Sequence, residues 1–475
     1  MKQITSFGNP FAQRLRCSFL LLSLFFIALS ASAQRVEKGT KVAWQGGKYE
    51  VFRLELRDKA GTKYSLKKPE KYLSQRALDR RQRQGIAVNE TDLPVSERYL
   101  KEIRKRGFEI IGGSRWLNTV LVKVERESDA VQLDELPFVN RITRVFITPD
   151  SVAETFVYPL LTDTLKPDTT VYGQGLRQME LLNVIPLHQA GYRGQGIRIA
   201  VLDGGFMNVD KIPTINSNVL EARDMTYPFT TNVYRLLEHG TQVLSCMSAK
   251  DEGRLVGGAP DAEYVLLRTE IGPTEQLIEE DWWVMAAEYA DSIGCDMLNS
   301  SLGYVHFTHH EMDHRYRDLD GKHSVAARAA SMLASKGIIL CNSAGNSGNN
   351  VWKKIGTPAD ASDILAVGAI DAKGVNTKFS SVGPSQDGRV KPDVMAMGGN
   401  TAVIGGRGIL KRNNGTSFSS PVLCGAVAAL WSALPNKTAY EIMDLVRHSA
   451  HQYDYPDNIF GYGIPNIWNA YLSGK

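Results

Sequence analysis

The chain has 475 residues, of which 43% are hydrophobic and 22% are charged, as in soluble globular proteins. This composition excludes a disordered tail protein and a polytopic membrane protein, and the length allows two or three folded units. The net charge of +4 is unevenly distributed: residues 34–150 hold 25 basic and 17 acidic residues (+8), and residues 151–475 hold 27 and 34 (−7). Since the basic half has no recognisable nucleic-acid-binding module, we expect a solvated surface or one that faces the acidic half, and no nucleic-acid partner.

Residues 1–33 have the pattern of a Sec-type signal peptide. Three basic residues precede an apolar run at 19–29, which the small residues 31–33 close. A membrane anchor is the alternative, but about a dozen apolar residues are too few for the ~20 that a spanning helix needs. We therefore expect cleavage before Gln34, a secreted protein in the periplasm or outside the cell, no membrane partner after cleavage, and no later membrane span.

Four cysteines remain after residue 33: Cys246, Cys295, Cys341 and Cys424. Each lies in an apolar or small-residue segment, which favours buried thiols over a disulfide framework. A single bridge stays possible at this point.

Residues 34–150 predict a small α+β domain. Strand-forming residues gather at 41–57, 117–124 and 142–146, and helical spacing is found at 96–106 and 129–136. The segment 67–84 is dense in Lys and Arg, which favours a solvated helix. Residues 151–173 mix Pro, Thr and Asp without periodicity and predict a linker.

Residues 174–475 predict an α/β domain with a doubly wound, mostly parallel sheet and helices on both faces. Short apolar runs at 197–202, 262–267, 296–299, 338–342 and 364–369 are typical of buried strands. Helical patterns occur between or after them at 239–249, 277–293, 324–336 and 417–434.

Three polar residues lie at strand ends and helix starts, where folds of this class place their functional residues. Asp203 ends the run 197–202 and is followed by two glycines, His239 opens a helix, and Ser417 lies at the head of the helix 417–434. Each has an ordinary alternative, namely turn formation, capping or packing. Together they supply a nucleophile, a general base and a carboxylate that orients the base, in the order Asp, His, Ser along the chain.

An oxyanion donor is the remaining requirement of such a triad. Asn346 follows the apolar strand 338–342 within the sequence Ser343-Ala344-Gly345-Asn346 and is the candidate. Its alternative is turn formation, because Asn beside Gly commonly forms turns.

These segments, taken in order, resemble the signature blocks of the subtilisin-like serine proteases, or subtilases. His239-Gly240-Thr241 resembles the histidine block, and Gly415-Thr416-Ser417 with Pro421 resembles the serine block. The resemblance implies that Asn346 donates to the oxyanion and that the segment 299–303 pairs with the substrate backbone and walls the primary pocket. It also implies that the segment 344–346 forms the opposite wall, with Gly356 at the floor of the pocket. The implied substrate-binding residues are Ser301, Leu302, Gly303, Ala344, Gly345 and Gly356.

The sequence departs from the family pattern beside the catalytic candidates. Gln242 stands where many relatives have a second histidine, Phe418 stands where methionine is common, and Gly204 follows Asp203 in place of Thr or Ser. These changes need not abolish the chemistry.

The domain at 34–150 resembles the inhibitory propeptide of secreted subtilases. This resemblance suggests a role for the basic charge of the domain. We hypothesise that the domain docks on the acidic domain, assists the folding of that domain and is cut off within the linker at about 150–174.

The sequence thus predicts a secreted serine endopeptidase that is made as a proenzyme and cleaves peptide bonds through an acyl-enzyme on Ser417. Its expected partners are protein or peptide substrates and its own propeptide, and a monomer is favoured. No cofactor or metal is required, and structural calcium stays open. Two rival hypotheses are an inactive homologue that serves as a binding protein and a different acyl hydrolase on the same scaffold.

Overall fold

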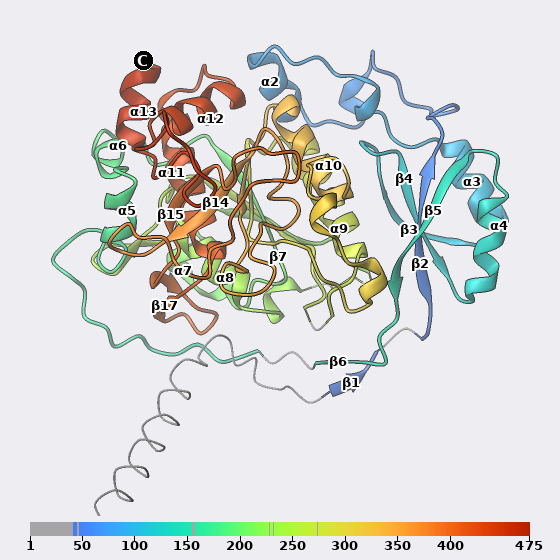
Figure 1. Ribbon diagram of the computed structural model, residues 1–475, viewed down its shortest axis with the longest axis horizontal. Helices are drawn as coiled ribbons and strands as arrows, with labels where there is room; N and C mark the ends of the chain where they lie inside the picture. The colour runs from blue at the N-terminus through green and yellow to red at the C-terminus, as the bar shows by residue number, and fades with distance from the viewer. Residues whose placement is uncertain (1–40, 45–46, 154–156, 228, 231, 273) are drawn as a thin grey trace, which may run out of the picture.

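The computed structural model describes residues 41–44, 47–153, 157–227, 229–230, 232–272 and 274–475 (Figure 1). The predicted signal peptide lies outside the described residues. The N-terminal unit holds an antiparallel sheet in the order β3-β4-β2-β5. Its elements are β1 (Lys41–Ala43), β2 (Glu50–Leu56), α2 (Gln75–Arg83), α3 (Glu97–Lys105), β3 (Glu109–Ser114), β4 (Thr119–Val124), α4 (Val131–Asp134), β5 (Val139–Ile147) and β6 (Ser151–Ala153).

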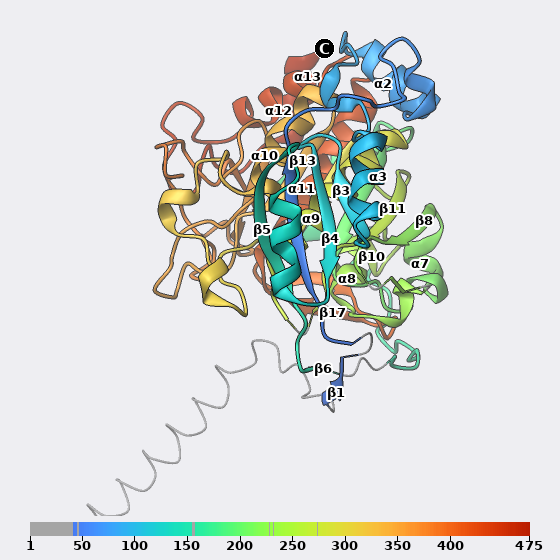
Figure 2. The ribbon, with the colours of Figure 1, turned by 90° about the vertical axis from the view of Figure 1, so that its right-hand side faces the viewer.

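Alternating side chains give this sheet two apolar faces. Phe52 and Leu54 of β2 pack with Ile103 of α3 in one core cluster. Val51 of β2 and Leu121 of β4 belong to a second cluster that continues into the C-terminal unit. Because successive side chains of a strand point to opposite faces, the same short strands serve both clusters. Figure 2 shows α3 and α4 covering the outer face of the sheet.

The C-terminal unit is built on a seven-stranded sheet in the order β15-β14-β13-β12-β7-β11-β8, in which every pairing is parallel. The predicted fold class is therefore confirmed. The sheet strands are β7 (Arg198–Asp203), β8 (Val219–Asp224), β11 (Glu263–Arg268), β12 (Met297–Ser300), β13 (Ile339–Ser343), β14 (Leu365–Ile370) and β15 (Val394–Met397).

Helices cover both faces of this sheet. The helices α8 (His239–Ser248) and α11 (Thr416–Ala433) pack on one face, and α9 (Ile278–Ser292) and α10 (Val325–Leu333) pack on the other, between the two sheets (Figure 1). The remaining helices and short strands are α5 (Leu176–Leu181), α6 (Ile185–Gln189), α7 (Pro213–Asn216), α12 (Ala439–His448), α13 (Ile467–Gly474), β9 (Lys250–Asp251), β10 (Leu255–Val256), β16 (Thr401–Ile404) and β17 (Leu410–Asn413).

The helix α11 is long and apolar enough to cross a membrane by length and composition, with a mean hydropathy of 1.2 over 18 residues. The sequence expectation of no later candidate was therefore wrong on that criterion. Of this window, 83% is buried inside the fold, where α11 forms the central helix of the core. A helix that is apolar on all sides is expected in such a buried position.

The packing of side chains tests two further expectations, the burial of the cysteines and the exposure of the basic segment at 67–84. All four cysteines are free and buried, as expected for thiols in apolar segments. The basic segment at 67–84, by contrast, is not a solvated helix: Arg80 and Arg81 of α2 are 0% and 1% exposed. Both guanidinium groups reach Asp291 of the C-terminal unit. The sequence does not reveal this burial because the acidic partner lies more than 200 residues away.

The predicted linker, residues 151–173, begins with β6, a short strand that pairs with β1 and was not expected from the sequence. From residue 157 onward it runs along the C-terminal unit towards α5 (Figure 1). The side-chain amide of Asn208 donates to the carbonyl of Tyr158 at 2.8 Å, and Asp163 accepts from the backbone N–H of Leu410 at 2.9 Å. The linker is therefore attached to the surface of the domain that it joins.

A buried ion triad fastens β15 to the C-terminal helices. Asp393, 6% exposed, accepts from Lys391 Nζ at 2.7 Å and from Arg447 Nε at 3.2 Å. Burial alone would raise the pKa of the Asp393 carboxyl, but the charges of Lys391 and Arg447 outweigh it and hold this pKa below its usual value.

We expect Asp393→Ala to lower the free energy of unfolding by about 3–5 kcal/mol, because it leaves Lys391 buried without its partner. The matched control is Asp387→Ala, which breaks the partly exposed pair with Arg389 and should cost at most about 1 kcal/mol. Urea unfolding of Ser417→Ala chains measures both, and equal costs would contradict the prediction.

Candidate active site

The predicted catalytic residues meet at the carboxyl-terminal edge of the parallel sheet. Asp203 is the last residue of β7, and Ser301 and Ala344 directly follow β12 and β13. His239 is the first residue of α8, and Ser417 is the second residue of α11. Parallel strands all end at one edge, so residues far apart in the chain come together there.

Asp203 and His239 form a charge-assisted pair. The Asp203 side chain is 1% exposed, and its Oδ2 lies 2.8 Å from His239 Nδ1. Its Oδ1 accepts from the backbone N–H of Gly204 at 2.8 Å. Because an ionised carboxylate only accepts hydrogen bonds, the pair favours the tautomer with the proton on Nδ1 and leaves Nε2 free to take a proton.

Glycine at position 240 permits the approach that forms this pair. A Cβ atom there would lie 2.4 Å from the carbonyl oxygen of Gly205 and 2.7 Å from a ring carbon of Phe206. The first turn of α8 therefore packs directly against the loop after β7. This contact explains why His239 and Gly240 occur together in the motif.

Ser417 lies in the first turn of α11, 9% exposed. Its hydroxyl donates to the carbonyl of Ser301 at 3.3 Å, and the Ser301 hydroxyl donates to the carbonyl of Ser417 at 2.8 Å. Within the part of the chain that the structure describes, no hydrogen bond joins Ser417 to His239. The imidazole does lie beside the next residue, with its centroid 5.9 Å from that of the Phe418 ring. In unliganded sites such hydrogen bonds are often long and tighten with substrate.

Asn346 is held in a defined orientation by the residue before Ser417. Its Oδ1 accepts from the backbone N–H and from the hydroxyl of Thr416, both at 2.9 Å. Since the oxygen faces these donors, the amide nitrogen faces away from them and is left to donate. The N–H groups of the first turn of α11 have no acceptor within their own helix. The geometry thus supplies two kinds of donor beside Ser417.

The predicted walls of the pocket also lie beside Ser417. Gly345 donates its N–H to the Thr416 hydroxyl at 3.2 Å, which ties one wall to α11. Tyr304, next to Gly303, exchanges backbone hydrogen bonds with Thr357, next to Gly356, at 2.7 and 3.1 Å. The Thr357–Pro358 bond is cis. The segments of Gly303 and Gly356 are therefore adjacent, and Ser301, Leu302 and Ala344 belong to the same edge of the sheet.

Gln242, which departs from the family pattern, and Glu238, which precedes His239, both have hydrogen-bond partners in the neighbouring hairpin. Gln242 accepts through Oε1 from Asn413 Nδ2 at 2.8 Å, which joins α8 to the β16–β17 hairpin. Glu238, the residue before His239, binds Lys411 Nζ at 2.5 Å and the N–H of Gly406 at 2.8 Å. These contacts hold the start of α8 in place without a second histidine.

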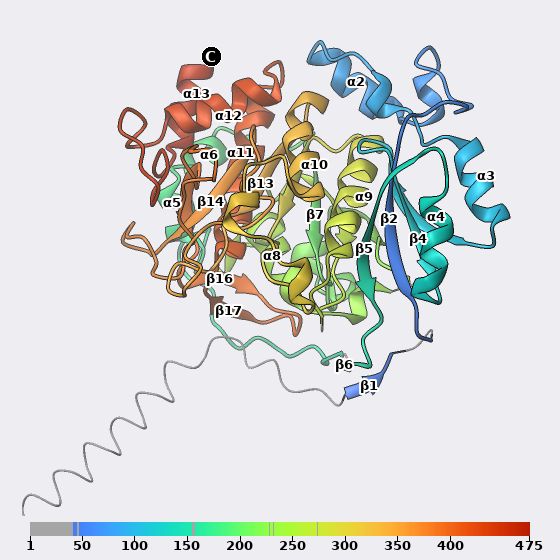
Figure 3. The ribbon, with the colours of Figure 1, turned by 45° about the vertical axis from the view of Figure 1, so that its right-hand side comes forward.

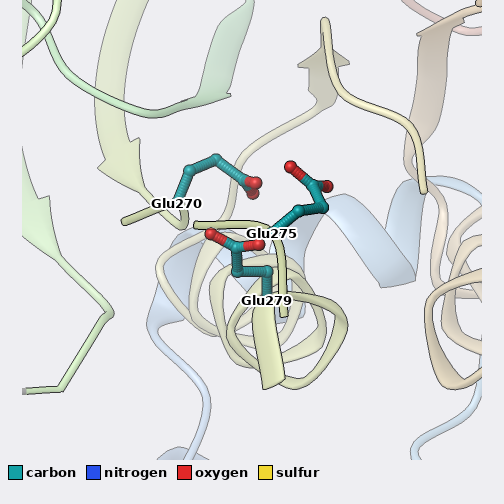
Figure 4. A group of neighbouring side chains, drawn as sticks. All are labelled: Glu270, Glu275 and Glu279. Atoms are coloured by element: carbon teal, nitrogen blue, oxygen red, sulfur yellow. The ribbon is translucent and has the colours of Figure 1, made fainter. Parts of the chain in front are cut away.

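Three glutamates that the sequence analysis did not single out gather near the triad. Carboxylate oxygens of Glu270, Glu275 and Glu279 lie within 4.8 Å of one another (Figure 4). Burial raises the pKa of Glu270 to about 7, and the charge of Asp203 adds to this rise. Burial and the charge of Glu270 raise the pKa of Glu275 to about 8. Among the described residues these carboxylates could hold a cation, and the raised pKa values of Glu270 and Glu275 show that their mutual repulsion also favours protonation.

Sequence reasoning missed Glu270 because a single acidic residue after a strand has no distinctive spacing. Its role in the fold is visible only in three dimensions: Tyr304 donates its hydroxyl to Glu270 at 2.7 Å. This hydrogen bond links the pocket wall to the loop after β11. Glu279 lies in a run of three acids at a helix start, which ordinarily reflects the helix dipole.

Comparison with known proteins gives two matching family models. The model described as "Subtilase family" matches residues 194–463, and "Peptidase S8 propeptide domain, Bacteroidota" matches residues 52–155. Membrane-bound transcription factor site-1 protease of Mus musculus is 32% identical over 257 residues, which are 53% of this chain and 22% of that protein. The chain thus spans about a fifth of the length of that relative.

Bacterial relatives and a solved structure extend the comparison. Serine protease AprX of Bacillus subtilis (strain 168) is 26% identical over 58% of this chain and 66% of its own length, and subtilisin E of the same strain is 28% identical over 58% and 65%. The crystal structure of epidermin leader peptide processing serine protease (EpiP) from Staphylococcus aureus has a TM-score of 0.61 at 16% identity, covering 90% of this chain and 99% of that one. At this identity the structural likeness shows the fold.

The imidazoles of His239 and His188 should titrate far apart. Burial lowers the pKa of His239, but the charge and hydrogen bond of Asp203 outweigh burial and raise it above 6.5. Burial lowers the pKa of His188 to about 4. We therefore expect NMR titration of Ser417→Ala protein to give a pKa above 6.5 for His239, and Asp203→Asn to lower it. An unchanged His239 pKa in Asp203→Asn would refute the electrostatic role of Asp203.

Proposed function

The chain belongs to the subtilase family, whose model matches more than half of it, and from this premise we propose that it is a serine endopeptidase with Asp203, His239 and Ser417 as its catalytic triad. The observation that carries the proposal is the Asp203–His239 hydrogen bond of 2.8 Å at the sheet edge where Ser417 also lies. We further propose that the chain is secreted and that residues 34–150, 151–173 and 174–475 are propeptide, linker and peptidase domain.

In the proposed mechanism His239 Nε2 takes the proton from Ser417 Oγ, which attacks the carbonyl carbon of the scissile peptide bond. Asp203 holds the imidazole in the required tautomer and stabilises its positive charge. Asn346 and the Ser417 N–H stabilise the oxyanion of the tetrahedral intermediate. The imidazolium then protonates the leaving amine, an acyl-enzyme forms on Ser417, and water attacks it with His239 again as base.

The proposed substrate segment runs between two walls. Ser301, Leu302 and Gly303 would pair with the substrate backbone and form one wall of the primary pocket, and Ala344 and Gly345 would form the opposite wall. Nothing in this chemistry requires a metal or cofactor.

We expect Ser417→Ala to abolish peptide hydrolysis and reaction with a fluorophosphonate probe. Asn346→Ala should lower kcat about 10²–10³-fold with little change in KM, because its donor acts on the oxyanion and not on bound substrate. The matched control is Asn350→Ala, in the same loop, whose side chain accepts from the N–H of Trp352 and should not affect kcat. Probe labelling of the wild type that survives Ser417→Ala would overturn the assignment.

Two rival functions have distinct readouts. An inactive homologue that serves as a binding protein would not react with the probe. A different acyl hydrolase would turn over a simple ester but not casein.

The pocket floor suggests a preference for a bulky apolar side chain before the cleaved bond. Gly356 carries no side chain, and a Cβ there would lie 3.0 Å from Val305 and 3.2 Å from the carbonyl of Tyr304. We expect kcat/KM for peptides with Phe at this position to exceed that for Ala by about 10–200-fold, and Gly356→Val to reduce the ratio. Peptides released from a proteome-derived library, identified by mass spectrometry, measure the preference; equal cleavage after Ala and Phe contradicts it.

A further inference from the structure

Histidines are concentrated in one segment that the proposed catalytic chemistry does not use. Five of the nine histidines of the chain lie within residues 306–323, which we call the histidine segment: His306, His309, His310, His314 and His323. The segment lies between β12 and α10 on the outside of the C-terminal unit, where Figure 3 draws it in gold. Imidazole is the commonest metal ligand in proteins, so the positions of these rings are informative.

Two of these imidazoles share one carboxylate oxygen. His306 Nδ1 and His310 Nδ1 each lie 3.2 Å from Oδ2 of Asp313. The other oxygen of this carboxylate, Oδ1, accepts from the backbone N–H of Phe307 at 2.7 Å, which fixes the orientation of the group. In the part of the chain that the structure describes, no Lys or Arg side chain pairs with Asp313.

The loop that carries these three side chains is closed by its own backbone. The N–H of His314 donates to the carbonyl of Val305 at 2.9 Å. The His306 ring packs edge-on against Trp352, with ring centroids 5.4 Å apart and an interplanar angle of 77°. The His310 side chain, by contrast, is 84% exposed. The carboxylate and one imidazole are therefore held in place, and the second imidazole can turn.

The distances agree with two edges of a tetrahedral metal site. Nitrogen and oxygen ligands lie about 2.0–2.2 Å from a zinc ion, which places them about 3.3–3.5 Å from one another. Among the described residues, only the three glutamates of Figure 4 already have ligand atoms within 4.8 Å of one another, so the two imidazole nitrogens lie farther apart than that. Rotation of the exposed His310 side chain, which exposed residues undergo within nanoseconds, closes this third edge.

The chemistry of the three ligands selects the kind of ion. Two imidazoles and one carboxylate form the ligand set of open zinc sites, in which water takes the fourth position. Calcium and magnesium prefer oxygen ligands alone. The four thiols of the described residues are buried and do not compete for the ion. Each imidazole would bind through Nδ1 as a neutral ligand and carry its proton on Nε2.

The loop also borders the floor of the predicted pocket. A Cβ on Gly356 would lie 3.0 Å from a methyl carbon of Val305, the residue before His306. Trp352, which packs against the His306 ring, donates its Nε1–H to the carbonyl of Ile355 at 3.0 Å. An ion bound to His306 would therefore hold a loop that touches the pocket floor from two sides.

We propose that His306, His310 and Asp313 form a binding site for one divalent transition-metal ion of the zinc type at the rim of the predicted pocket. Water completes the coordination. The site is formed by the loop after the pocket wall, so that ion binding does not depend on Ser417 or on the proposed function.

The first experiment measures zinc binding directly. Ser417→Ala chain without a histidine tag is stripped of metal with EDTA, desalted and titrated with zinc sulfate by isothermal titration calorimetry at neutral pH. Loss of outer-shell partners alone costs about 10–100-fold in metal affinity, so we expect His306→Ala/His310→Ala to weaken zinc binding at least about 100-fold. A parent chain that binds no zinc, or unchanged affinity in the double variant, overturns the inference.

The matched control is His309→Ala/His323→Ala, which removes two imidazoles from the same segment. The His323 ring faces Asp318, at 3.8 Å from its carboxylate, and not Asp313. We expect this variant to bind zinc with the affinity of the parent chain. An equal loss in the two double variants would mean that histidine content and not this site determines binding, and it overturns the inference.

The third ligand is tested with cobalt, whose visible spectrum reports coordination geometry. We expect cobalt chloride to give the intense bands of a tetrahedral ion in the parent chain, without thiolate charge-transfer bands. Asp313→Asn keeps an acceptor for the Phe307 N–H, so the loop stays closed, but it removes the charged ligand and should weaken binding at least about 10-fold. A spectrum of six oxygen ligands, or unchanged affinity in Asp313→Asn, overturns the inference.

Discussion

The structure depends on one constraint, namely that all strands of a parallel sheet end at the same edge. Every strand of the central sheet leaves by the same edge, and that edge receives Asp203 from β7, Ser301 from β12 and Asn346 from the turn after β13. Two helices begin at the same edge and bring His239 and Ser417. The site therefore needs no continuous stretch of sequence. It needs strands in the right order and helices that start in the right place.

The opposite edge of the sheet has a different chemistry. There α9 ends and β12 begins, and the side chains facing out are carboxylates that arginines of the N-terminal unit neutralise. Part of the uneven charge of the chain lies in this contact, where arginines of the N-terminal unit pair with buried carboxylates of the C-terminal unit: Arg53, Arg76, Arg80, Arg81 and Arg115. Arginine suits such a surface because its planar group binds two acceptors at once, as Arg81 does between Asp92 and Asp291.

Much of this arrangement could be predicted from the sequence because the strands and helices that form it have recognisable short-range patterns of apolar and polar residues. Apolar runs ending in polar residues predicted the strands that hold the site, and the order of Asp203, His239 and Ser417 predicted their role. The edge strand β8 was missed because most of its side chains are partly or fully exposed, so it contains no apolar run, and β15, at the other edge, was also missed. The buried α2 was predicted to be solvated because its own sequence is highly basic. Glu270 was missed for a related reason. Its contacts with Tyr304 and the nearby glutamates join segments that only the fold brings together.

The N-terminal unit meets the C-terminal unit at both edges of the sheet. The buried ion pairs of Asp291 and Asp296 lie at the end of α9 and at the amino-terminal edge of the sheet. Ile147, the last residue of β5, exchanges hydrogen bonds with Gln276 beside the glutamate cluster. The ion pairs that neutralise Asp291 and Asp296 therefore lie at the opposite end of the strands from the proposed catalytic residues, so the charge of this contact and the charge of the site are arranged independently of each other.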